Sequence, residues 1–195
     1  MKTGIIVGRF QVPMLTDGHK YLIKNAAFEV DQLIIFIGDT KDGKLTSHDP
    51  LPFEARVKSI NQFISQAIDD PLDLYERKLL SLSKDENIKI FRIVDVGNYP
   101  KWVENLDSKI EALRLLEIIP EDNEIFIIGS RDSVAQKYKD NGGKFDTIEI
   151  NELKDSNNIS ISGTEYRKNL VESFSPSWDM GERKFAIWLV SKISE

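Results

Sequence analysis

The chain has 195 residues, of which 41% are hydrophobic and 30% charged, as is usual for one folded domain of comfortable size. It contains no cysteine, which excludes a disulfide framework and a thiolate metal site. The net charge of −6 argues against a general nucleic-acid binder, although a small anionic ligand needs only a few local cations. No apolar run reaches transmembrane length and no signal-peptide pattern is present, so we expect a cytoplasmic protein without a membrane partner.

The chain begins with the pattern of a strand, a loop and a helix. The apolar run 3–7 predicts a buried strand that Gly8 ends, and apolar residues recur at helical spacing from about 18 to 29. Thr16 or Asp17 can cap this helix by accepting from its free backbone N–H groups. A strand, a loop and a helix N-terminus in this order make an anion site, because those N–H groups and the helix dipole favour negative charge.

The same loop carries side chains that suit a bound polyphosphate. Arg9 supplies a cation, Thr16 a hydroxyl group and His19 an imidazole. Gly18 has no side chain and lets a ligand approach the backbone closely.

Strand and helix patterns then alternate along most of the chain. Continuous apolar runs predict further strands over 33–37 and 124–128. Residues 88–94, in which apolar and basic residues alternate, are predicted as another strand, and 145–150 as the last one. Amphipathic spacing predicts helices over 52–68, 101–117 and 132–139. In the second of these helices the pattern places Trp102 and Leu116 on the inward face. Residues 69–87 are charged, and we interpret them as inserted surface structure or an oligomer contact, with a short helix near 71–80.

This alternation predicts an α/β fold, a Rossmann-like open parallel sheet with helices on both faces. Ligands of such sheets bind beyond the carboxyl ends of the strands. Gly8, Gly38, Asp95 and Gly129 all fall at predicted strand ends, so we expect the loops there to converge on one cleft.

The pattern changes at residue 151. A polar loop is followed by two predicted helices, over about 159–173 and 178–193. We therefore expect a single domain over residues 1–195, with a core over 1–150 and C-terminal helices in the part 151–195.

Two short motifs at the start of the chain resemble a known family. Residues 16–19, Thr-Asp-Gly-His, resemble the (His/Thr)-x-Gly-His signature of nucleotidylyltransferases. Residues 8–11, Gly-Arg-Phe-Gln, resemble the corresponding start of nicotinamide mononucleotide (NMN) adenylyltransferases. Residues 49–56 also resemble a helix start of that family, with differences, although a purely structural helix start explains most of them better.

A second signature lies near the other end of the chain. Residues 161–167, Ile-Ser-Gly-Thr-Glu-Tyr-Arg, resemble the family's Ile-Ser-x-Thr-x-x-Arg. The hydroxyl groups of Ser162 and Thr164 at a helix start can face phosphate oxygens, and Arg167 can grip two oxygens at once. The same residues fit a capping box, and both interpretations can hold together. The pairing of two signatures across an α/β pattern is far more specific than either one.

The resemblance also implies roles for residues between the signatures. Trp102 would stack on the nicotinamide ring by a cation–π contact, with a place in the hydrophobic core as its alternative. Asp95 and Gln11 would contact NMN, and the loop with Gly129 and Arg131 would hold the adenosine part, although Arg131 could also be merely solvated.

The activity that the resemblance implies is adenylyl transfer from ATP to NMN, giving NAD and pyrophosphate. The implied catalytic residues are His19, Thr16 and Arg167. The implied ATP-binding residues are Gly8, Arg9, Phe10, Gly18, Gly129, Arg131, Ser162 and Thr164, and Mg²⁺ would be bound mainly through the phosphates.

Two alternatives stay open at this point. The acceptor could be another phosphate-bearing molecule, with an adenylyl or cytidylyl group transferred. The chain could also be a non-catalytic nucleotide-binding regulatory module, because Thr16 replaces the first histidine of the motif and the loop 11–16 is longer than usual. A homo-oligomer is compatible with either alternative.

Overall fold

The computed structural model describes residues 1–154 except for 13, 41–48, 50, 70–72 and 131–133. In this part of the chain, one parallel sheet contains the strands in the order β3-β2-β1-β4-β5. Their bounds are β1 (Lys2–Gly8), β2 (Gln32–Asp39), β3 (Ile88–Val94), β4 (Glu124–Ser130) and β5 (Asp146–Ile150). The parallel α/β fold predicted from the sequence is confirmed.

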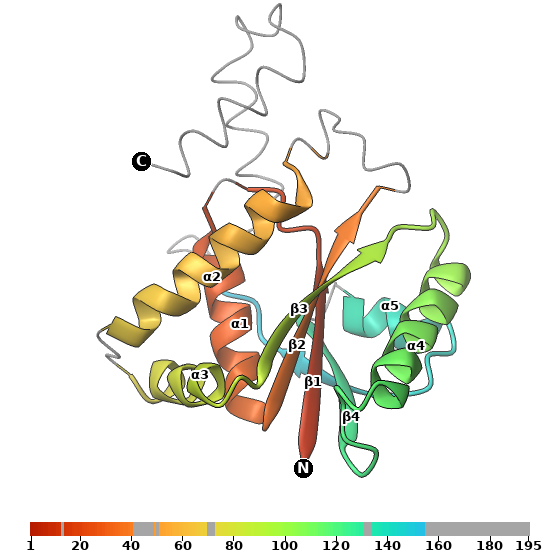
Figure 1. The fold of residues 1–195 in the computed structure, drawn as a ribbon. Helices are drawn as coiled ribbons and strands as arrows, with labels where there is room; N and C mark the ends of the chain where they lie inside the picture. The colour runs from red at the N-terminus through yellow and green to blue at the C-terminus, as the bar shows by residue number, and fades with distance from the viewer. Residues whose placement is uncertain (13, 41–48, 50, 70–72, 131–133, 155–195) are drawn as a thin grey trace, which may run out of the picture.

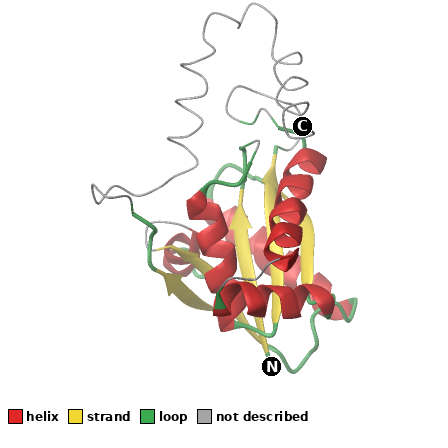
Figure 2. Cartoon of the chain, turned by 90° about the vertical axis from the view of Figure 1, so that its left-hand side faces the viewer, coloured by secondary structure: helices red, strands yellow, loops and turns green. Residues whose placement is uncertain are grey.

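Helices cover both faces of the sheet (Figure 1). On one face lie α1 (Asp17–Glu29), α2 (Phe53–Asp69) and α3 (Leu74–Lys84), and on the other lie α4 (Tyr99–Leu115) and α5 (Val134–Asp140). Figure 2 shows the same layers after a quarter turn, with helices in front of the strands.

The register of the central strands explains their continuous apolar sequences. Ile5 of β1 lies opposite Ile34 of β2 and Ile127 of β4, and all three face the core beneath α4 and α5. The next residue of each strand points to the opposite face, where Ile6 and Ile35 pack beneath α1 and α2. Because both faces are covered, each position needs an apolar side chain.

The predicted insertion 69–87 belongs partly to the core. Leu79 and Leu82 of α3 are buried, and α3 packs against α1 and α2. Lys24 of α1 pairs with Asp73 and Glu76 at the start of α3, with Nζ–O distances of 3.3 and 3.2 Å. The expectation of mere surface structure was therefore wrong, because two leucines one turn apart are enough to dock a short charged helix.

The end of α4 also differs from the expectation. Leu116 was predicted to face inward, yet its side chain is 68% exposed. The helix ends at Leu115, and Glu117 has a φ of 58°, so the chain leaves the helical path before Leu116 can reach the core. Ile119, after the turn, is fully buried in its place.

A buried polar network closes the amino end of the sheet. The Thr3 hydroxyl donates to Oε1 of Gln32 (3.0 Å) and accepts from Nδ2 of Asn123 (2.9 Å). Nε2 of Gln32 donates to the carbonyl oxygen of Ile118 (2.8 Å). These bonds join the starts of β1 and β2 to the turn before β4.

The C-terminal helices predicted over 159–173 and 178–193 lie outside the described residues. The division into a core and a C-terminal helical part therefore stays a prediction. Within residues 1–154, less the gaps given above, no helix has the length and apolar character needed to cross a membrane.

Candidate active site

A cavity of about 460 Å³ lies at the carboxyl ends of β1, β2 and β3. Gly8, Gly38 and Asp95, which the sequence placed at strand ends, all line it, so the predicted convergence is confirmed for these three residues. Gly129 is buried near the end of β4 and is not among the lining residues.

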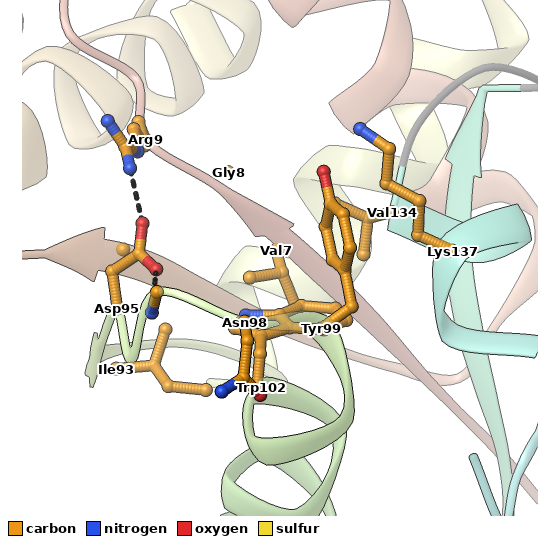
Figure 3. Close-up of a pocket in the computed structure, with 12 residues that line it drawn as sticks. Val7, Gly8, Arg9, Ile93, Asp95, Asn98, Tyr99, Trp102, Val134 and Lys137 are labelled. Carbon is orange, nitrogen blue, oxygen red and sulfur yellow. Dashed lines mark hydrogen bonds and ion pairs between the residues drawn. The ribbon is translucent and has the colours of Figure 1, made fainter. Parts of the chain in front are cut away.

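One side of the cavity carries an ion-pair cluster. Nη1 of Arg9 lies 3.2 Å from Oδ2 of Asp49, and Nη2 of Arg9 contacts the carboxylate of Asp95 (Figure 3). Partial burial acts to lower the pKa of Arg9, but the two carboxylates outweigh it and raise that pKa above its ordinary value. The side chain of Arg9 is still 49% exposed, so the oriented guanidinium can meet a ligand phosphate.

The opposite side is aromatic and belongs to the first turns of α4. Asn98 caps this helix by accepting from the backbone N–H of Lys101 (3.0 Å), which places Tyr99 and Trp102 at the cavity. Figure 3 shows Tyr99 standing beside Lys137 of α5, whose Nζ lies 5.2 Å from the centre of the tyrosine ring.

Trp102 combines the two roles that the sequence left open. Its ring lines the cavity, and it also packs edge-on against Tyr138 at 6.4 Å between ring centres and 89° between planes. The side chain is half-buried, with one part in contact with the core and another facing the cavity. Ring stacking with a ligand therefore remains a prediction that the position of Trp102 allows.

A buried hydrogen bond joins the two helices that border the cavity. The hydroxyl of Tyr138 in α5 donates to the carboxylate of Asp107 in α4 and accepts from the backbone N–H of Phe145 (3.2 Å). Burial first, and then the contact with Asp107, raise the pKa of Tyr138, so its hydroxyl stays protonated. This bond fixes the spacing between the aromatic side and Lys137.

Behind the cavity, Arg56 of α2 is fully buried and holds the ends of two strands. It donates to the carbonyl oxygens of Arg9 (3.0 Å) and Gly38 (2.6 Å) and to Oδ1 of Asp39 (2.9 Å). Burial lowers the pKa of Arg56, and Asp39 opposes that effect. The sequence showed only a helix start here, because contacts with distant carbonyl oxygens leave no local pattern.

The N-terminus of α1 brings several predicted residues together. Thr16 is the N-cap, and its hydroxyl lies 2.8 Å from Nδ1 of His19. The ring of His19 packs against Phe10, with 5.3 Å between ring centres. A side chain at Gly8 would meet the Phe10 ring at 2.9 Å, so only glycine allows this close approach. Gly18 lies in the first turn of the same helix.

Gln11 is buried away from the cavity and binds the backbone of a neighbouring segment. Its side chain is 1% exposed, accepts from the backbone N–H of Leu51 (2.9 Å) and donates to the carbonyl oxygen of Leu51 (3.4 Å). These bonds tie the loop after β1 to the segment before α2. A contact between Gln11 and NMN stays a prediction.

Four predicted site residues, Arg131, Ser162, Thr164 and Arg167, lie outside the described residues. The predicted closure of the two signatures around one triphosphate therefore stays a prediction. The residues that sequence reasoning missed are Asn98, Tyr99 and Lys137. Of these, Asn98 carried a usable signal, because an asparagine two residues before a proline is typical of a helix start. Asp49 belongs to the stretch 49–56 that resembles the family, but its pairing with Arg9 was not predicted.

The described residues contain no group of three or more His, Asp or Glu side chains able to hold a metal ion. Asp95, which lines the cavity, and Asp49 are both paired with Arg9.

Solved structures of low sequence identity share this fold. A bifunctional NMN adenylyltransferase/ADP ribose pyrophosphatase from Francisella tularensis is 20% identical with a TM-score of 0.62, and its complex with AMP and a Mn ion is 21% identical with a TM-score of 0.57. Both comparisons cover 88% of this chain and 42% of the other. A NadR protein in complex with NR is 19% identical, with a TM-score of 0.50 and coverage of 89% and 42%. This chain thus spans less than half the length of these proteins.

The sequence matches none of the curated proteins. A family model described as cytidylyltransferase-like, in contrast, matches residues 5–169. The matched range begins within β1 and continues past β5, so it includes the whole sheet edge that borders the cavity. From this match and the parallel sheet together, the chain belongs to the cytidylyltransferase-like family of the nucleotidyltransferase superfamily.

Proposed function

We propose that this protein transfers the adenylyl group of ATP to NMN and releases NAD and pyrophosphate. The observation that carries the proposal is the cavity at the carboxyl ends of the strands, which has the cation of Arg9 on one side and the aromatic ring of Trp102 on another. A mononucleotide with a pyridinium ring needs both a partner for its phosphate and an electron-rich surface for its ring. The similar fold of the F. tularensis protein, a bifunctional NMN adenylyltransferase/ADP ribose pyrophosphatase, supports NMN as the acceptor.

The proposed reaction needs no general base, because the acceptor phosphate is already an anion at neutral pH. An oxygen of the NMN phosphate attacks the α-phosphorus of ATP and forms the new P–O bond. The bond from the α-phosphorus to the bridging oxygen breaks, and pyrophosphate leaves with the electron pair. Catalysis then comes from alignment of the three reacting atoms and from stabilisation of the charge that develops on the phosphates.

In this proposal His19 donates to the α-phosphate, and Arg9 and Arg167 bind the remaining phosphate oxygens. The N-terminus of α1, with Gly18 in its first turn, would add backbone N–H groups that bind the phosphates in this proposal. Mg²⁺ would be held mainly by the triphosphate, where it neutralises charge, and the pairing of Asp49 and Asp95 with Arg9 fits that arrangement.

The decisive experiment measures pyrophosphate release from ATP or CTP with a panel of acceptors. NMN, nicotinate mononucleotide and phosphopantetheine are compared at equal concentration. We expect ATP with NMN to give the largest kcat/KM. A larger kcat/KM for another acceptor or for CTP would support nucleotidyl transfer but show that NMN or ATP is not the preferred substrate.

The same panel separates turnover from binding alone. Calorimetry with ATP, NMN and NAD gives their affinities independently of any reaction. Tight binding of NAD or ATP without pyrophosphate release from any pair would contradict the enzyme and support a regulatory nucleotide-binding module.

A further inference from the structure

The first turn of α1 pairs a histidine with its own helix cap. In the common capping box, a Glu or Gln at the third helical position reaches back to the backbone N–H of the cap residue. Here His19 takes that place: Nδ1 lies 3.3 Å from the backbone nitrogen of Thr16 and 2.8 Å from its hydroxyl oxygen. In return, the Thr16 hydroxyl accepts from the backbone N–H of His19 (3.4 Å).

These contacts point to the ring nitrogen of His19 that carries the proton. A backbone N–H can only donate, so in its contact with Thr16 the Nδ1 atom is the acceptor and carries no hydrogen. The Thr16 hydroxyl oxygen accepts from the backbone N–H of His19. The hydrogen of the same hydroxyl can then point at Nδ1 and donate to it. A neutral imidazole has one N–H group, which is therefore Nε2–H.

The ring is also held from a second direction. Phe10 packs against it at an angle of 44° between the ring planes. Phe10 itself is 3% exposed, has a φ of 49°, and lies against Gly8 at the end of β1. The loop after β1 and the cap of α1 thus orient one imidazole together.

We propose that Thr16 is a positioning residue, which acts through His19 and not by direct contact with a phosphate. Its N–H and hydroxyl groups hold Nδ1, so that His19 offers Nε2–H as a hydrogen-bond donor to the nucleotide. The catalytic consequence rests on the proposed function, whereas the protonation of the ring does not. A donor held in place before the ligand binds costs no reorganisation during the reaction.

The protonation is tested directly by NMR. The chain contains only two histidines, so His48→Gln leaves the imidazole of His19 as the single side-chain signal. Long-range ¹H–¹⁵N correlation on ¹⁵N-histidine-labelled protein near pH 8 distinguishes a protonated from an unprotonated ring nitrogen. We expect protonated Nε2 and unprotonated Nδ1. A protonated Nδ1, or an average of the two forms, would overturn the proposal.

The positioning role is tested with two matched variants. Thr16→Ser keeps both hydrogen-bonding groups, and we expect its kcat to stay within about threefold of wild type. Thr16→Val keeps the shape but removes the hydroxyl, and we expect kcat to fall about tenfold or more while the KM for ATP changes less than about threefold. The ¹⁵N signals of His19 should move in Thr16→Val and not in Thr16→Ser.

Each other pattern in these variants counts against the proposal. A raised KM for ATP with unchanged kcat in Thr16→Val would make Thr16 a direct phosphate contact. Unchanged kcat with unmoved ¹⁵N signals would leave the hydroxyl without a role. If wild type releases no pyrophosphate, the proposed function fails while the NMR result remains readable. If wild type turns over but Nδ1 is protonated, only this inference fails.

Discussion

The polar side chains at the two ends of the sheet differ in charge and in burial. At the amino end, the neutral side chains of Thr3, Gln32 and Asn123 are buried and bonded to one another. At the carboxyl end, Arg9 and Asp95 carry opposite charges, form an ion pair and are partly exposed beside a cavity. A neutral buried network stabilises a fold, since its groups would cost free energy if left unpaired. A charged, half-exposed cluster adds little stability, but its cation can replace a carboxylate partner by the phosphate of an anionic ligand.

The largest effect should come from His19→Ala at the carboxyl end. We expect kcat to fall about 10²–10⁴-fold, because in the proposed mechanism His19 is a donor that stabilises charge in the transition state. Single-turnover measurements with ATP and NMN give the rate, and urea denaturation tests whether the fold survives. A rate near that of wild type would remove His19 from the mechanism.

The matching change at the amino end is Thr3→Val. It removes the hydroxyl group that Gln32 and Asn123 share, so two buried amide groups lose a partner. We expect the free energy of unfolding to fall by about 2 kcal/mol. KM for both substrates should stay within about twofold of wild type, and a larger change would show that the two ends are coupled.

Trp102→Leu tests the aromatic side of the cavity. Leucine keeps an apolar contact with the core but has no aromatic face, so we expect KM for NMN to rise about tenfold. KM for ATP should change less than about twofold, because ATP occupies the other part of the site in the proposal. The KM of Trp102→Phe for NMN should lie between those of wild type and Trp102→Leu. Equal changes in KM for NMN and for ATP would indicate that Trp102 serves only in the hydrophobic core.

The smallest effect should come from Asp73→Ala, away from both ends of the sheet. Asp73 caps α3 by accepting from the backbone N–H of Glu76 (2.8 Å), and this bond lowers its pKa below the ordinary value of 3.8. The capping contribution, about 1 kcal/mol, is therefore present above pH 3.8 and is lost as pH falls through the lowered pKa. Urea denaturation of both proteins at several pH values should show this difference shrinking in acid, with KM unaffected at neutral pH.

Secondary structure followed closely from local pattern. Residues 88–94 were predicted as a strand and form β3 with the same bounds, and each remaining predicted strand is found within two residues at its ends. Apolar runs and helical spacing are local properties, so they can be read without knowledge of the fold. The docking of α3 was missed because two buried leucines in a charged segment resemble a surface helix.

The site was predictable to the extent that topology dictates it. Gly8, Gly38 and Asp95 end three neighbouring parallel strands, and such ends meet at one edge of a sheet. Tyr99 and Lys137 were missed because they come from different helices and meet only when α4 and α5 lie side by side. The pairing of Arg9 with Asp49 spans forty residues of chain and has no local signal.

The amino-acid sequence by itself determined the succession of strands and helices along the chain, the parallel sheet and the edge of the sheet at which the cavity lies. Periodicity and chain connectivity suffice for these, because they depend on neighbours along the chain. Only the tertiary structure decided that Arg9 is held by two carboxylates, that buried Arg56 braces two strand ends, and that Thr16 turns toward His19. These are contacts of individual atoms, and their energies depend on distance and burial, which become defined only when the layers pack.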